Sequence, residues 1–176
     1  MRAEVTANYW QSRRQFRYYR EVLRLAREHA PAGGSALDVG ANETELLGWL
    51  DWFERRVAVD VRDVPECPGI EAIVADFNRF EPEGAFDLVL CLQVLEHLEA
   101  PAPFARKLLR TGRIAIVSVP YRWPGWVTDE HVQDPVDESK LRWWTARDPI
   151  ATSVVEDLGM ERLISVYQGD SATRST

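Results

Sequence analysis

The sequence predicts an α/β domain built on a doubly wound, mostly parallel β-sheet. Short apolar segments recur along the chain and alternate with segments of helical or loop composition, as expected of successive βαβ units. The first apolar segment ends in Asp38-Val39-Gly40 and passes at once into a turn followed by helix-forming residues. This pattern is typical of the carboxyl edge of an open α/β sheet, where such sheets bind their ligands.

Length and composition indicate one domain. The chain of 176 residues can bury a core without disulfides, so we expect a single domain over residues 1–176. The formal net charge of −7 disfavours a surface that binds the phosphates of nucleic acid. The two cysteines make no disulfide framework, and we find neither a signal peptide nor an apolar run long enough for a membrane span. We therefore expect a soluble, cytoplasmic protein.

The first part of the chain, residues 1–34, is predicted to form one helix over residues 8–29. Apolar and aromatic side chains recur there at helical spacing, and Pro31 with Gly33-Gly34 ends the pattern. The core follows over residues 35–119. Its predicted elements are a strand at 36–39, a helix at 44–53, and strands at 56–61, 72–75, 86–92 and 113–119.

Two of these strands carry an acid at or just after their end. Asp60 closes the apolar part of the second strand, about twenty residues after Asp38, and Asp76 follows the third. A carboxylate at the end of the second strand can accept hydrogen bonds from ribose hydroxyls, so the acids favour a nucleotide site. The GxGxxG pattern of NAD sites is absent. The alternative reading is structural: Gly40 in an ordinary turn, and the acids as helix N-caps.

The chain after Pro120 changes in composition. Residues 120–147 are dense in aromatics, acids and prolines and are predicted to form a lid or substrate loop with a short helix at 137–144. Residues 148–168 are predicted to contain a helix at 150–158 and a last strand at 161–167, and residues 169–176 to form a tail. With one strand after residue 119, the domain has a shortened C-terminal end.

Five segments in this order resemble the class I S-adenosylmethionine-dependent methyltransferases: LDVGANET, VAVD, VAD, FDLVLCLQVLEHL and RIAIVSVP. The resemblance covers nearly the whole chain and implies a Rossmann-like sheet, a methyltransferase activity and S-adenosylmethionine as cofactor. The first loop departs from the family, because Asn42 and Thr44 stand where glycine is common.

The resemblance also implies roles for seven residues. Asp38, Gly40 and Asn42 would shape the methionine end of the cofactor site, and Asp60 would bind the ribose. The remaining three are Asp76 with Phe77, which would border the adenine, and Gln93, which would lie close to the methyl group.

A second polar group follows the fourth strand. If a helical turn begins there, Gln93, Glu96 and His97 share one face at the edge of the sheet. The segment resembles the ExxEH motif of metal-binding ubiquinone-pathway O-methyltransferases and of enzymes that 2′-O-methylate small-RNA ends, with Gln93 in place of the first glutamate. In those enzymes a further histidine completes the site, and His131 in the later loop is the candidate here.

Two chemistries follow from this resemblance. In one, Glu96, His97 and His131 hold a divalent ion, Mg²⁺ or Mn²⁺, that lowers the pKa of an acceptor hydroxyl and orients it. In the other, no metal is needed and a histidine acts as general base.

The later loop indicates the kind of acceptor. Tyr121, Trp123 and Asp134 combine aromatic rings with a carboxylate, and rings of this kind stack on the C–H faces of sugars. The stretch DEHVQDPVD resembles loops of bacterial sugar O-methyltransferases.

These observations leave three hypotheses. The first is an O-methyltransferase for a hydroxyl of a small polar acceptor, a sugar or glycoside. The second is a non-catalytic cofactor-binding or partner subunit, motivated by the single late strand, whose exposed edge a homodimer partner or the N-terminal helix would cover. The third, an RNA 2′-O-methyltransferase, is disfavoured by the acidic charge.

Overall fold

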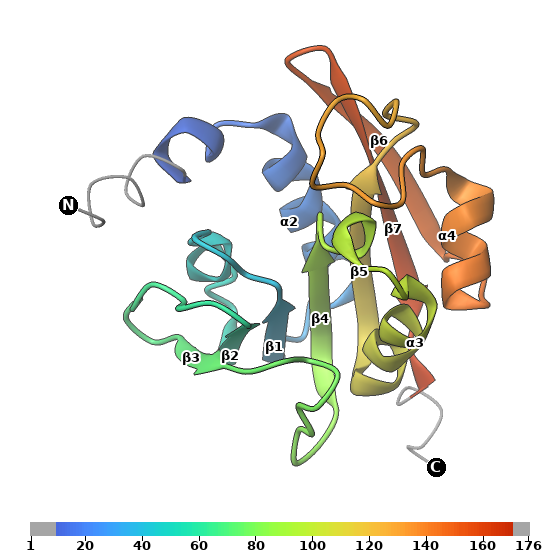
Figure 1. Ribbon diagram of the computed structural model, residues 1–176. Coiled ribbons are helices and arrows are strands. Elements are labelled where there is room, and N and C mark those ends of the chain that lie inside the picture. Colours follow the sequence, from blue (N-terminus) through green and yellow to red (C-terminus); the bar gives the residue numbers. More distant parts are fainter. Residues whose placement is uncertain (1–9, 171–176) are drawn as a thin grey trace.

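The computed structural model describes residues 10–170, which form one α/β domain around a seven-stranded sheet (Figure 1). Its strand order is β3-β2-β1-β4-β5-β7-β6, and the pairs from β3 to β5 are parallel whereas β7 runs antiparallel to β5 and β6. The strands are β1 (Gly34–Val39), β2 (Phe53–Asp60), β3 (Glu71–Val74), β4 (Phe86–Leu92), β5 (Gly112–Pro120), β6 (Ala151–Asp157) and β7 (Met160–Gln168). The predicted doubly wound, mostly parallel sheet is confirmed.

Helices cover both faces of the sheet, so the central strands are buried on both sides. On one face, α3 (Pro101–Thr111) and α4 (Glu138–Thr145) pack over a core that includes Leu37, Val89 and Trp144. On the other face, α2 (Arg17–His29) packs with the 3₁₀ turn η1 (Leu46–Trp49) over Leu88, Ile116 and their neighbours. This double burial explains the continuous apolar run of β4.

Helix α3 was not predicted from the sequence. Helical spacing separates its buried residues Phe104, Ala105, Leu108 and Leu109. Pro101 suits the first turn, because a backbone N–H at that position would have no partner within the helix. The helix carries the chain from the carboxyl end of β4 back to the start of β5, as a parallel connection requires.

The helix predicted at residues 44–53 is wrong. Only the short turn η1 is helical, and Phe53 already begins β2 by pairing with Gly34 of β1. The apolar spacing that suggested a helix arises because Leu46, Leu47 and Leu50 all face the core from a tight connection.

The helix predicted at residues 150–158 is also wrong, because β6 occupies this segment. Exposure alternates along most of β6, as in an edge strand with one face on the core, and Val154 and Val155 are β-branched. A tight turn at Leu158 and Gly159, both with positive φ, joins β6 to β7. The two strands form a complete antiparallel hairpin, so the predicted shortening of the C-terminal end is wrong.

The N-terminal helix is interrupted rather than continuous over the predicted range. Residues 10–13 form one helical turn, the chain is extended at Phe16, and α2 begins at Arg17, while residues 8 and 9 lie outside the described part. Residues 171–176 of the predicted tail also lie outside it. Within residues 10–170 no helix has the length and apolar character that crossing a membrane requires.

Asp157 in β6 caps α2 from a distance of 140 positions in sequence. Its two carboxylate oxygens accept hydrogen bonds from the backbone N–H groups of Arg17 and Tyr18, each at 3.0 Å. Phe16 at the N-cap position offers no side-chain cap. The hairpin thus satisfies N–H groups that helix geometry leaves without partners.

We expect Asp157→Ala to lower the free energy of unfolding by about 1–2 kcal/mol, the usual cost of a lost N-cap. Urea denaturation followed by circular dichroism measures the change. Glu156→Ala is the matched control, because this neighbouring side chain is exposed. Equal stability of the two variants would contradict the capping role.

Candidate active site

The turns after β1 and β4 meet at the carboxyl edge of the sheet. Gly40, just after β1, has a φ of 76°, and a Cβ atom there would lie 2.4 Å from Cγ2 of Val94. Only glycine therefore permits this approach. It brings the loop of the first strand against the segment that carries the second polar group.

The carboxylate of Asp60 is fixed between two loops. Its Oδ2 accepts a hydrogen bond from the backbone N–H of Asn42 and its Oδ1 one from that of Arg62, both at 2.9 Å. Asn42 adopts a left-handed conformation, with φ 47°, which asparagine tolerates better than most residues other than glycine. Each carboxylate oxygen keeps a lone pair that can accept a hydroxyl hydrogen bond.

Asp38 lies near Asp60, and its side chain is almost fully buried. Its exposed fraction is 3%, and burial, with a contribution from the nearby Asp60 charge, raises the pKa of its carboxyl to about 7. The structure thus brings together Asp38, Gly40, Asn42 and Asp60. Their contact with a cofactor stays a prediction.

The predicted adenine pair divides into one surface and one core residue. The Oδ1 atom of Asp76 accepts hydrogen bonds from the backbone N–H and side-chain amide of Asn78, and its side chain is exposed at the edge. Phe77 packs inside the core, with its ring centre 5.0 Å from that of Phe104. Only Asp76 therefore offers its side chain to a ligand.

Gln93 lies outside the helical turn in which it was predicted. The turn η2 spans Leu95–His97, whereas Gln93 precedes it with a φ of 58°. The backbone N–H of Gln93 donates a hydrogen bond to the carbonyl of Ser118 in β5. Its Nε2 donates to Oγ of Ser118 (3.2 Å), which is hydrogen-bonded with the hydroxyl of Tyr18 (2.5 Å). Tyr18 and Ser118 were not predicted as site residues, because nothing in the local sequence indicates that α2 reaches this edge.

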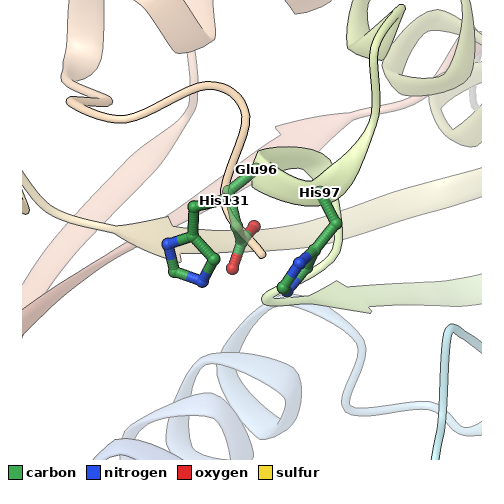
Figure 2. A group of neighbouring side chains, drawn as sticks. All are labelled: Glu96, His97 and His131. Carbon is green, nitrogen blue, oxygen red and sulfur yellow. The ribbon is translucent and has the colours of Figure 1, made fainter. Parts of the chain in front are cut away.

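Glu96, His97 and His131 come together, and we call them the Glu96–His97–His131 cluster (Figure 2). One potential ligand atom from each residue lies within 4.8 Å of the other two. Figure 2 shows Glu96 and His97 on η2 and His131 on the loop between β5 and α4. The backbone N–H of Val132 donates to the carbonyl of Glu96 at 2.9 Å and holds the loop against the turn.

Both imidazoles are fixed through Nδ1. In His97 this atom lies 2.9 Å from the carbonyl oxygen of Glu130, and in His131 it lies 2.7 Å from Oδ2 of Asp134. A carbonyl or carboxylate oxygen only accepts, so each Nδ1 carries the hydrogen and donates it. In the neutral rings the Nε2 atoms then carry lone pairs, as in histidines that bind metals or accept protons.

The carboxylate of Glu96 is buried without a partner. Its side chain is fully inside the protein, and neither oxygen accepts a hydrogen bond from another residue. The pKa of Glu96 is raised to about 8, chiefly by burial and to a smaller extent by the charge of Asp134, whereas its own backbone N–H and the charge of Arg162 lower it. Unpaired buried acceptors beside two imidazole lone pairs suit a cation.

The predicted acceptor residues occupy different places. Trp123 stacks on His131 with ring centres 5.8 Å apart, and its Nε1 donates to the carbonyl of Glu161. The Tyr121 hydroxyl donates to Oε1 of Glu138. Asp134 has a side chain only 1% exposed and is bonded to His131, so it supports that ring rather than facing an acceptor.

Comparison with known proteins agrees with this architecture. The family model described as "Methyltransferase domain" matches residues 9–170. No curated protein sequence matches the chain.

Three solved structures illustrate the fold. The N-methyltransferase NodS from Bradyrhizobium japonicum WM9, in complex with S-adenosylhomocysteine, superposes with a TM-score of 0.70 at 15% identity, over 87% of this chain and 86% of that one. The 1,6-didemethyltoxoflavin-N1-methyltransferase of Burkholderia thailandensis gives 0.71 at 16% identity, over 95% and 86%. The N-terminal domain of EvdMO1, in the presence of S-adenosylhomocysteine and D-fucose, gives 0.61 at 15% identity, over 88% and 84%.

The raised pKa of Glu96 predicts that the metal-free chain loses free energy of unfolding as the pH rises. From about pH 4.5 to 8 the folded state retains a proton that the unfolded state releases, so ionisation costs stability as the pH rises. We expect Glu96→Gln to gain stability relative to the natural chain over this range, by an amount on the order of a few kcal/mol. Urea denaturation with chelator at pH 5, 7 and 9 measures the difference.

Glu99→Gln provides the control for this prediction, since Glu99 is exposed two residues beyond η2. A difference between Glu96→Gln and the natural chain that stays constant from pH 5 to 9 would show that Glu96 titrates normally.

Proposed function

The chain belongs to the methyltransferase-domain family that residues 9–170 match, and we propose that it methylates a hydroxyl oxygen of a small polar acceptor, a sugar or a glycoside. Family and fold make it an S-adenosylmethionine-dependent methyltransferase of the class I type. The proposal concerns the atom that is methylated, the acceptor and the means of its activation. The Glu96–His97–His131 cluster carries it.

S-adenosylmethionine supplies an already activated methyl group on a positively charged sulfur. What the chain must add is placement of the acceptor oxygen in line with that group and a destination for its proton. Asp60, Gly40 and Asn42 form the cradle at the end of β1 and β2. The cluster lies beyond β4, next to Gln93, on the same edge of the sheet.

The residues of the cluster fit a divalent metal ion. Glu96 offers two carboxylate oxygens without other partners, and His97 and His131 offer Nε2 lone pairs in rings held through Nδ1. These donors suit Mn²⁺ or Mg²⁺, and such an ion would lower the pKa of a bound hydroxyl. Asp134 strengthens the donor character of His131, as carboxylates behind metal-binding histidines do.

The same geometry supports a histidine base in the absence of metal. Either Nε2 atom can accept the proton of a hydroxyl, and the Asp134 carboxylate would stabilise the resulting positive charge on His131. Glu96 in this case holds its own proton near neutral pH, because of its raised pKa. Metal and base mechanisms differ in their response to chelator.

A sugar acceptor is favoured by the partly exposed indole of Trp123 beside His131. A flat ring next to polar groups stacks on the C–H face of a sugar while hydroxyl groups reach those polar groups. The neighbour structure of EvdMO1 with D-fucose is consistent with this class. The alternative of a non-catalytic partner subunit loses its motivation, since β6 and β7 complete the sheet.

We expect Asp60→Ala to weaken binding of S-adenosylhomocysteine by about 10- to 100-fold, because it removes hydrogen bonds to a charged acceptor and releases the Asn42 loop. Isothermal titration calorimetry measures the affinity. Asp63→Ala, an exposed acid in the following loop, is the control. If Asp60→Ala binds as tightly as the control, the cradle is misassigned.

We expect His131→Ala to weaken Mn²⁺ binding by about 100-fold or more and to abolish methyl transfer, because it removes one of three ligands. Calorimetry with Mn²⁺ measures the first effect. A methyl-transfer screen over sugars, phenols and short RNA, with and without chelator, measures the second.

His29→Ala is the matched control for His131→Ala, since His29 lies at the end of α2. Activity that survives chelator but not His131→Ala would replace the metal with a histidine base. Activity that survives both would remove the cluster from the mechanism.

A further inference from the structure

Arg162 is a buried cation at the edge of the sheet where the site lies. It pairs in register with Pro120, the last residue of β5, and so stands at the carboxyl end of the parallel strands. Its exposed fraction is 8%. Neither the family resemblance nor the Glu96–His97–His131 cluster uses this residue.

The guanidinium of Arg162 has little compensation within residues 10–170. Its one hydrogen bond, from NH1 to the carbonyl of Met160, is long at 3.5 Å, and it makes no ion pair. The rings of Phe16, Tyr18 and Trp123 surround it at 5.4–5.6 Å. Aromatic faces attract a cation but satisfy none of its N–H donors, so apart from the Met160 carbonyl the described residues offer these donors no acceptor.

A pocket of about 280 Å³ opens beside this guanidinium. Arg162 and Arg13 line it together with Phe16, Met160 and Asp157. The only carboxylate among these residues is that of Asp157, whose oxygens already accept the N–H groups at the start of α2. The lining of the pocket thus carries two arginine charges and one carboxylate charge, and this net positive charge suits an anion.

Trp123 contacts both Arg162 and the Glu96–His97–His131 cluster. The centre of its ring lies 5.4 Å from the guanidinium carbon of Arg162 and 5.8 Å from the centre of the His131 ring. The separation between Arg162 and His131 is thus no larger than these two distances together, which one small acceptor molecule can span. The positive charge of Arg162 also lowers the pKa of Glu96 by electrostatic attraction.

We propose that Arg162 and the pocket it lines bind an anionic group, a carboxylate or a phosphate, carried by the acceptor whose hydroxyl is methylated. The subsite rests on the proposed function for its role, because it orients an acceptor relative to the Glu96–His97–His131 cluster. It narrows the acceptor class from neutral sugars to acidic or phosphorylated ones. A planar guanidinium recognises both groups through paired hydrogen bonds.

The test uses the full chain saturated with S-adenosylhomocysteine and follows binding by calorimetry. Acetate and inorganic phosphate probe the anion site alone, and their relative affinities distinguish a carboxylate from a phosphate site. D-glucose, D-glucuronate and D-glucose 6-phosphate then probe the anion within a sugar. The variants are Arg162→Gln and Arg162→Lys, with Arg55→Gln, an exposed arginine on β2, as the matched control.

We expect at least one of the two simple anions to bind the natural chain and to bind Arg162→Gln at least about tenfold more weakly, as loss of a charge-assisted hydrogen bond predicts. Arg162→Lys should restore part of the affinity, and Arg55→Gln should match the natural chain. D-glucuronate or D-glucose 6-phosphate should bind more tightly than D-glucose, and only to chains with a cation at position 162.

The proposal is overturned if neither simple anion binds the natural chain, or if Arg162→Gln binds them unchanged. It is also overturned if folded Arg162→Gln loses S-adenosylhomocysteine instead, because Arg162 would then hold the carboxylate of the cofactor. If Arg162→Gln does not fold, the natural chain alone decides. The proposal is then rejected if the natural chain binds the simple anions and the charged sugars no more tightly than D-glucose. Arg162-dependent anion binding without any methyl transfer would keep the subsite and reject the O-methyltransferase proposal.

Discussion

The buried carboxylate of Glu96 is the interaction on which the candidate site depends. It lies inside the protein with no hydrogen-bond donor from another residue, and the buried Asp134 stands near enough to raise its pKa further. Such an arrangement costs stability unless a proton or a cation balances it. In the two imidazoles beside it, Nδ1 donates a hydrogen bond to another residue, and the lone pair of Nε2 can bind a cation or accept a proton. Arg162 contacts the same Trp123 ring as His131, and its charge lowers the pKa of Glu96, so acids, imidazoles and guanidinium form one electrostatic unit.

The sheet places this unit where chemistry is possible. Both faces of β1, β4 and β5 are buried under helices, so functional loops can emerge only at the strand ends. Gly40 lets the turn after β1 touch Val94 in the turn after β4, and the carbonyl of Glu96 binds the loop that brings His131. The turn after β1 and the Glu96–His97–His131 cluster are therefore neighbours, joined by the packing of Val94 against Gly40 and by the backbone hydrogen bond at Glu96.

The sequence predicted the five parallel strands well, and its two wrong helices have one physical source. A short run of apolar residues looks the same whether it packs as a helix or as a strand or loop, because each can direct those residues into the core. Residues 44–53 were assigned by spacing, but pairing of Phe53 with Gly34 takes the end of that segment into β2. Residues 150–158 became an edge strand because β7 offers them a partner, which no local pattern reveals. Helix α3 was missed although its buried residues have helical spacing.

For the site, the sequence by itself determined the family, the acids that end β1 and β2, and the three members of the Glu96–His97–His131 cluster. These signals are local, since each is a residue type at a fixed offset from a strand end. Only the tertiary structure decided that Asp134 supports His131 instead of meeting an acceptor, that Gln93 turns toward Ser118 and Tyr18, and that Arg162 is buried beside Trp123. Those arrangements join segments as far apart as α2, β5 and β7, and their burial and unpaired charges arise only when the strands assemble.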